Sequence, residues 1–211
     1  MEVELIRYTP DPVELVGEAA AICTNAKHRD KARRVALASG HTSILEHASF
    51  TFRIEGVSRA LLAQLTRHRI ASFSVESQRY VDMGEMPCVI PQTIADKPEV
   101  LEAYKQVLQH VKAFYRFAVD KGISTEDARY ATPQAACTQL IVTMNARELQ
   151  HFFSMRCCNR AQWEIQEMAD QMLMLCQNKA PELFSKAGPG CVRGKCPEGK
   201  MSCGRPRNGN G

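Results

Sequence analysis

The segment from Pro98 to Gly122 carries the strongest structural signal in the chain, a stripe of apolar residues at helical spacing. The stripe consists of Val100, Leu101, Tyr104, Val107, Leu108, Val111, Tyr115 and Ala118. Proline is favoured in the first turn of a helix and glycine just beyond the last turn, so both ends of the segment are typical of helix boundaries. The sequence therefore predicts one long amphipathic helix, which any fold of this chain has to accommodate.

Other helices are indicated by apolar spacing and by residues typical of helix ends. They are expected over residues 13–22, 29–38, 59 to about 69, a short stretch after 124, 145–157 and 161–179. Ser58 is a predicted N-cap, Ser124 and Asn145 each open a predicted capping box, and Gly40 stands where a left-handed C-terminal cap belongs. The helix that begins at Arg59 is expected to carry the triplet Arg67-His68-Arg69 at or near its end.

Strand signals are fewer and lie far apart in the sequence. Residues 48–54 alternate apolar and polar side chains, residues 138–144 are rich in β-formers, and residues 70–97 read as a long ordered loop with short strands at most. Several helices with a few separated strands predict an α+β fold, a small mixed or antiparallel sheet flanked by long helices. We expect a single domain over residues 1–186, followed by a flexible basic tail over residues 187–211 that holds Cys191, Cys196 and Cys203.

Composition and charge narrow the class of protein. The 211 residues are 45% hydrophobic and 24% charged, as in globular proteins, and the net charge of +4 is too small to require a polyanionic partner. The N-terminal residues resemble neither a secretory signal nor a transit peptide, and no apolar run has the length of a membrane span. Nine scattered cysteines suggest reduced thiols, so we expect a cytoplasmic protein without a membrane partner.

The stretch from Arg67 to Tyr80 is the most unusual part of the sequence. It combines three arginines, one histidine, three serines and a glutamate within fourteen residues. Guanidinium groups bind phosphate oxygens in pairs, and serine hydroxyls add neutral donors, so the stretch is suited to hold an anion. Cations that merely favour a helix C-terminus are an equally good explanation from the residues alone.

The spacing of this stretch resembles a family signature. Arg67-His68-Arg69, seven residues and then Ser77 is similar to the motif of the flavin-dependent thymidylate synthases. Further similar segments are 41–47, Asn145-Ala-Arg147, and Arg156 with residues 160–165, in the same order and at similar spacing.

The resemblance implies a cofactor site and a substrate site. The FAD residues that it implies are Ser43, Arg67, His68, Arg69, Val75 (backbone only), Asn145, Arg147 and His151. The dUMP residues that it implies are Gln64, Arg67, Ser77, Gln78, Arg79, Arg129 and Arg156, of which Arg156 is the catalytic candidate, stabilising negative charge on the uracil ring. One position departs from the motif: the glutamate that many members have two places before the serine is Val75 here, and Glu76 comes one place later.

Metal and cysteine chemistry are weaker interpretations. His41 and His47 have no third ligand at metal-like spacing, and the three tail thiols lack a fourth partner, so no metal site is expected. Cys88 lacks the histidine that follows the nucleophile of cysteine-dependent thymidylate synthases, because Val89 stands there. His151 could also be a buried core histidine on the face of its helix.

By this resemblance the chain is a flavoprotein methyltransferase of nucleotide biosynthesis that reductively methylates dUMP to dTMP. Methylenetetrahydrofolate would supply the carbon and NADPH the reducing equivalents through FAD, in a homotetramer. The chain has no Gly-x-Gly-x-x-Gly fingerprint, so NADPH is not expected on a Rossmann unit. The alternative is a nucleic-acid-binding module that uses residues 67–79 and the tail, against which the modest net charge counts.

Overall fold

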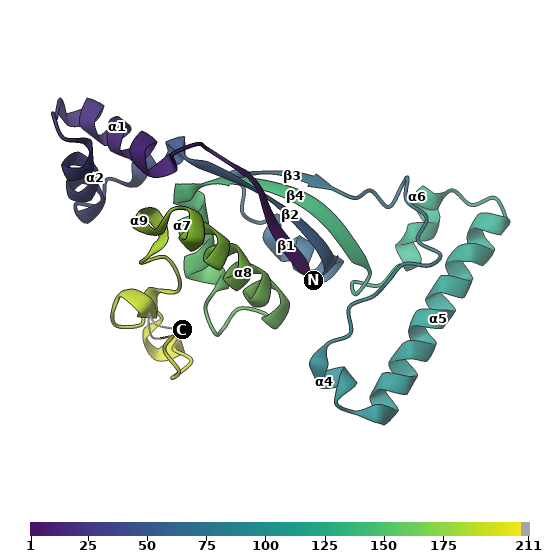
Figure 1. Cartoon of the computed structure of the whole chain (residues 1–211). Coiled ribbons are helices and arrows are strands. Elements are labelled where there is room, and N and C mark those ends of the chain that lie inside the picture. The colour runs from purple at the N-terminus through teal and green to yellow at the C-terminus, as the bar shows by residue number, and fades with distance from the viewer. Residues whose placement is uncertain (208–211) are drawn as a thin grey trace. The chain divides into compact units, whose positions relative to one another are not determined.

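The computed structural model describes residues 1–207, in which helices and strands are mixed along the chain (Figure 1). The strands are β1 (Glu2–Tyr8), β2 (Ser49–Ser58), β3 (Ala71–Val75) and β4 (Cys137–Asn145). They form one antiparallel sheet in the order β1-β2-β4-β3. The predicted α+β class with a small sheet is therefore confirmed.

The helices agree closely with the sequence pattern. They are α1 (Pro12–Thr24), α2 (Arg29–Ala38), α3 (Arg59–Leu65), α4 (Gln92–Ala95), α5 (Pro98–Asp120), α6 (Thr125–Ala128), α7 (Ala146–Arg156), α8 (Trp163–Lys179) and α9 (Pro181–Phe184). Short 3-10 helices are η1 (Thr42–His47), η2 (Arg129–Ala131), η3 (Gly190–Arg193) and η4 (Gly199–Met201). One prediction was wrong in detail: α3 ends at Leu65, so the triplet Arg67-His68-Arg69 follows the helix instead of lying on it.

The predicted helix caps form by the expected contacts. The side chains of Ser58, Ser124 and Asn145 accept hydrogen bonds from backbone N–H groups three residues later. Gly40 has a φ of 78°, and His41 N–H donates to the carbonyl of Ala36 at 2.9 Å, which closes α2 as a left-handed C-terminal motif.

Two junctions between a strand and a helix contain no loop. Ser58 is the last residue of β2 and caps α3, and Asn145 is the last residue of β4 and caps α7. The first residues of these helices therefore follow directly from the register of the sheet.

The chain divides into two compact units. The α5 unit consists of residues 1–2, 54–67 and 74–140, and the α7 unit consists of residues 3–53, 68–73 and 141–211, of which the structure describes those up to 207. No linker separates the units, because β2, β3 and β4 each continue from one into the other.

The α7 unit is held together by buried aromatic residues on the sheet and on two helices. Phe50 of β2 packs edge-on against Phe184 of α9, with ring centres 5.3 Å apart, and Phe184 contacts Phe153 of α7. Phe152 continues the cluster. This aromatic core supports one side of α7, the helix that carries the candidate residues Arg147, His151 and Arg156.

The α5 unit has its own core, to which the long helix α5 contributes. Tyr115 and Ala118 of α5 pack with Met83, Met86 and Ala128. The expected loop over residues 70–97 is ordered, as predicted, and contributes both methionines; it also contains β3 and α4.

The C-terminal residues contact α8 and the loop before it. Arg207 donates to Asp170 at 2.7 Å, and Arg160 pairs with Glu198 at 3.0 Å. The flexibility of this segment and its boundary after residue 186 stay predictions. No described helix is both long and apolar enough to cross a lipid bilayer.

Candidate functional site

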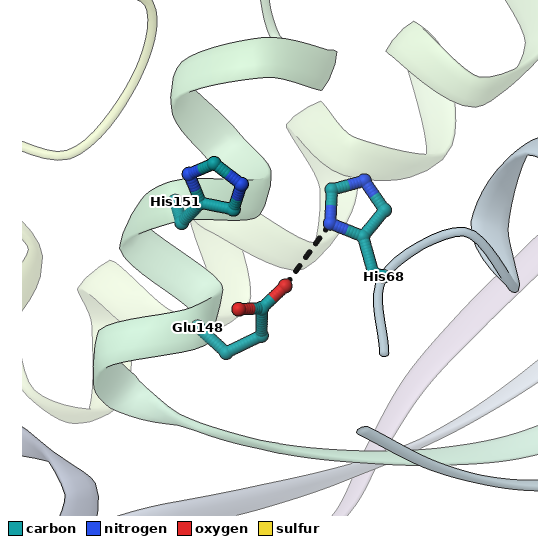
Figure 2. Close-up of side chains that lie close together, drawn as sticks. All are labelled: His68, Glu148 and His151. Carbon is teal, nitrogen blue, oxygen red and sulfur yellow. Dashed lines mark hydrogen bonds and ion pairs between the residues drawn. The ribbon is translucent and has the colours of Figure 1, made fainter. Parts of the chain in front are cut away.

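The start of α7 brings a carboxylate to the buried histidine of the Arg-His-Arg triplet. Asn145 caps the helix by accepting from Glu148 N–H at 2.9 Å, as half of a capping box would. The Glu148 carboxylate does not complete that box: its Oε1 lies 3.0 Å from Nδ1 of His68 (Figure 2). Both side chains are almost fully buried, His68 at 5% and Glu148 at 7% exposed.

Arg156, at the end of the same helix, contacts the other side of the imidazole. Its Nε donates to Nε2 of His68 at 3.1 Å. Phe152 packs edge-on against the His68 ring at 4.9 Å, and the His151 ring centre lies 5.9 Å away. The four polar residues Glu148, His68, Arg156 and His151 are called the His68 cluster below.

Burial governs the protonation of this cluster. Desolvation lowers the pKa of His68 below its usual value, the Glu148 hydrogen bond opposes this effect, and Arg156 adds to it. Desolvation also lowers the pKa of Arg156. Because a guanidinium remains charged in proteins, the arrangement is a neutral imidazole between a carboxylate and a cation.

His68, Glu148 and His151 also bring potential metal-ligand atoms within 4.8 Å of one another. Both ring nitrogens of His68 already have hydrogen-bond partners, and one partner is a guanidinium. A cation beside that guanidinium would be repelled, so the contacts favour a hydrogen-bonded cluster over a metal site.

A cationic cavity of about 600 Å³ lies along α7. Its lining includes Arg147 and His151, both expected at the FAD site, together with Arg34, Lys186 and Arg193. His151 is exposed, which rules out the alternative of a buried core histidine. Cations with neighbouring hydroxyls and an imidazole are a donor set that fits a pyrophosphate and the edge of a polar ring.

The other expected FAD residues have varied surroundings. Arg147 forms an ion pair with Glu46, so its guanidinium is not reserved for a ligand. Ser43 lines a different cavity, beside α1 and α2, and Arg69 is exposed. Arg67 is exposed in the α5 unit, and Val75 ends β3 in that unit.

The expected dUMP residues other than Arg156 lie in the α5 unit, and three of them gather around α6 and η2. Gln78 donates to the hydroxyl of Thr132 at 3.1 Å, and Arg129 donates to the carbonyl of Glu126 at 2.9 Å. Arg79 pairs with the Glu126 carboxylate at 2.9 Å.

Ser77 and Gln64 make local contacts in the same unit. The hydroxyl of Ser77 accepts from the N–H of Arg79 at 3.2 Å. Gln64, on α3, donates to the carbonyl of Ala60 at 3.3 Å.

Arg59 is a residue that the sequence interpretation missed. It lines a cavity of about 490 Å³ with Gln78 and Arg129, here called the Arg59 pocket. Its Nη2 donates to the carbonyl of Glu76 at 2.9 Å, but its buried Nε has no hydrogen-bond partner among the described residues. Burial lowers the pKa of Arg59, Glu76 raises it, and the nearby charge of Arg129 lowers it further.

The sequence did contain a signal for Arg59. A cation in the first turn of a helix is unfavourable because it opposes the helix dipole. Arg59 lies in the first turn of α3, one residue after the N-cap Ser58, and Arg147 lies in the first turn of α7, two residues after the N-cap Asn145. Glu148 was not predicted as a site residue for another reason: the capping-box pattern already explained the presence of a glutamate at that position.

These features define an α+β protein with cationic cavities suited to anionic ligands, one of them beside a buried histidine cluster. A family model described as "Thymidylate synthase complementing protein" matches residues 4–182, and the chain belongs to this family. The predicted resemblance is therefore confirmed.

Relatives and solved structures agree with that assignment. Proteins named flavin-dependent thymidylate synthase are 48% identical in Geobacter sulfurreducens, over 97% of this chain and 94% of the relative, and 45% identical in Nitratidesulfovibrio vulgaris, over 96% and 94%. A crystal structure of the flavin-dependent thymidylate synthase of Helicobacter pylori, complexed with FAD and dUMP, is 29% identical. It superposes with a TM-score of 0.73 over 89% of this chain and all of that one.

Proposed function

We propose that this protein is a flavin-dependent thymidylate synthase that methylates dUMP reductively to dTMP. The observation that carries the proposal is 48% identity, over nearly the whole of both chains, to a relative with that name. The Helicobacter pylori structure, which shares the fold, is complexed with FAD and dUMP. In this reaction methylenetetrahydrofolate supplies the carbon, and NADPH supplies the reducing equivalents.

FAD is held by the triplet, by residues at the start of α7 and on it, and by Ser43 and the end of β3. The set is Ser43, Arg67, His68, Arg69, the backbone of Val75, Asn145, Arg147 and His151. The cationic cavity along α7 supports this assignment, because its guanidinium and ammonium groups suit a pyrophosphate. Bound FAD, once reduced, supplies the hydride, and the part of the protein is to bind and orient.

The nucleotide substrate is held by Gln64, Arg67, Ser77, Gln78, Arg79, Arg129 and Arg156. The grouping of Gln78, Arg79 and Arg129 around α6 and η2 supports a phosphate site in the α5 unit. Thr132 positions the Gln78 amide, and Glu126 positions both arginines.

Arg156 acts on the uracil ring. Its guanidinium stabilises negative charge that develops on the ring as carbon 5 becomes nucleophilic. Desolvation strengthens this effect, because a partly buried cation interacts more strongly with charge than a hydrated one.

Other parts of the proposal rest on the family resemblance. They are the homotetramer, NADPH and the folate as co-substrates, and the absence of a nucleic-acid partner. A cytoplasmic location is supported by the cysteines, all nine of which are free.

Two measurements test the function. The purified protein should show a flavin absorbance spectrum or take up FAD in equilibrium dialysis, and it should form dTMP from dUMP only with the folate and NADPH. Absence of FAD uptake at micromolar concentration contradicts the proposal. A colourless protein whose affinity for RNA or DNA falls steeply with salt would instead support the nucleic-acid alternative.

A further inference from the structure

The direction of each hydrogen bond in the His68 cluster follows from the chemistry of its members. An ionised carboxylate only accepts, so Nδ1 of His68 must carry the proton that Glu148 Oε1 accepts at 3.0 Å (Figure 2). A guanidinium only donates, so Nε2 of His68 must offer its lone pair to Nε of Arg156 at 3.1 Å. The two contacts together select one neutral tautomer of the imidazole.

We propose that Glu148 is a positioning residue that orients the Arg156 guanidinium through the imidazole of His68. The carboxylate keeps the His68 proton on Nδ1, and Nε2 then holds the arginine by its Nε. The inference rests on the proposed role of Arg156 at the uracil ring.

The opposite tautomer would break the arrangement. A proton on Nε2 would face the N–H of Arg156, and the unprotonated Nδ1 would face the Glu148 carboxylate, so both hydrogen bonds would be lost. Water has little access to compensate, because His68 and Glu148 are both more than nine-tenths buried. The Phe152 ring, packed edge-on at 4.9 Å, limits rotation of the imidazole away from the arginine.

In the described part of the chain, no other charged or titratable group that acts on the His68 ring keeps its proton on Nδ1. Those that act on the His68 ring within residues 1–207 are Glu148, Arg156 and His151, all on α7. Arg67 and Arg69 flank His68 in the chain and are exposed. Glu148 is therefore the one acceptor among these groups that can hold the proton on Nδ1.

The first experiment is a double-mutant cycle on dUMP affinity in the FAD-loaded enzyme. Glu148→Leu removes the acceptor at similar size, and we expect the dissociation constant for dUMP to rise about 10- to 100-fold. In an Arg156→Lys background the same substitution should add no more than about a twofold loss, because lysine has no Nε to orient. Equal losses in both backgrounds would overturn the proposal.

Glu148→Gln separates the acceptor from its charge. The glutamine oxygen can still accept from Nδ1, so this variant should lose less dUMP affinity than Glu148→Leu. Equal losses of dUMP affinity in the two variants would mean that the negative charge of Glu148, and not the position of the His68 proton, controls dUMP binding, and this would overturn the proposal. Asp170→Asn is the control: it removes a partly buried carboxylate on α8 whose partner is Arg207, and dUMP affinity should stay at the parent value.

The second experiment reads the tautomer directly and does not depend on catalysis. Long-range proton–nitrogen correlation spectra of isotope-labelled histidine distinguish a proton on Nδ1 from one on Nε2. We expect Nδ1–H for His68 in the parent protein and in Asp170→Asn, and a shift toward Nε2–H in Glu148→Leu. An Nε2–H form in the parent protein overturns the positioning role even if dUMP is methylated, whereas Nδ1–H in a protein that binds no dUMP refutes only the proposed function.

Discussion

The two units differ in how far their buried polar groups satisfy one another. In the His68 cluster of the α7 unit, a carboxylate, an imidazole and a guanidinium alternate, and each contact joins a donor to an acceptor. In the Arg59 pocket of the α5 unit, two guanidiniums repel each other, and a buried Nε has no partner among residues 1–207.

The difference indicates different tasks. A cluster that is complete without a ligand serves to hold a side chain in a fixed orientation. A pocket with an excess of donors and of positive charge is completed by an anion, because a buried unpaired donor otherwise costs about 1–3 kcal/mol. Substitutions in the first region should therefore act through the orientation of Arg156, and those in the second should act on anion affinity directly.

Arg156→Lys should give the largest effect. The charge is retained, but the planar group that contacts His68, and for which we propose a role at the uracil ring, is lost, so kcat/KM for dUMP should fall about 100-fold or more. Steady-state kinetics and thermal unfolding check this expectation, since the unfolding temperature should change little. A variant that turns over at the parent rate would show that Arg156 has no catalytic role.

Arg129→Leu should weaken dUMP binding about 10- to 100-fold, as expected for the loss of a charged hydrogen bond to phosphate. Deoxyuridine, which lacks the phosphate, should bind the variant and the parent almost equally. Isothermal titration with both ligands measures the difference. An equal loss for both ligands would place Arg129 away from the phosphate.

Arg59→Met tests the same pocket through the stability of the ligand-free protein. Removal of one of two like charges and of the unpaired Nε should leave the ligand-free protein at least as stable as the parent. Inorganic phosphate should raise the unfolding temperature of the parent more than that of the variant. A marked destabilisation of the ligand-free variant would contradict the view that the Arg59 guanidinium serves to bind an anion.

The stability of the His68 cluster should depend on pH with a definite sign. The pKa of His68 is lowered in the fold, so the unfolded chain binds more protons at and below the usual pKa of 6.5. The free energy of unfolding should therefore decrease as the pH falls from about 7.5 through that value. In urea titrations, the free energy of unfolding of His68→Gln should depend less on pH than that of the parent protein. The control His110→Gln, which replaces an exposed histidine on α5, should keep the pH dependence of the parent.

Substitution of the cysteines should have the smallest effect on catalysis. Burial raises the pKa values of Cys88 and Cys157, which disfavours the thiolate that a nucleophile needs. Alanine variants at Cys88, Cys157 and Cys158 should retain dTMP formation, with a stability loss of about 1 kcal/mol for the buried Cys157. If any of them folds and binds FAD but forms no dTMP, a thiol takes part in the reaction.

Local signals were sufficient for most of the fold. The apolar stripe on α5 and the caps Ser58, Ser124 and Asn145 depend on neighbours within a few residues, so the sequence pattern contains them. Strand β3 was not predicted as such because its pairing partner, β4, lies more than sixty residues further along. Strand β1 was not predicted, although Val3 and Leu5 alternate with glutamates, because so short an alternation is distinctive only once its pairing with β2 is known.

The candidate site was predictable only in part, for a related reason. The motif singled out His68 and Arg156, but it did not indicate that Glu148 contacts His68 across eighty positions. It also did not indicate that Arg59 and Arg129 converge on one pocket. Such contacts depend on tertiary packing, which no local spacing encodes.

The two junctions without a loop restrict how this chain can change in length. One residue inserted after Ser58 or Asn145 would rotate the following helix by about 100° relative to its strand. Arg59, Arg147 and Glu148 would then point away from their present partners. Insertions and deletions that preserve activity should therefore be absent from these junctions and should fall in exposed connections, such as the turn between α5 and α6.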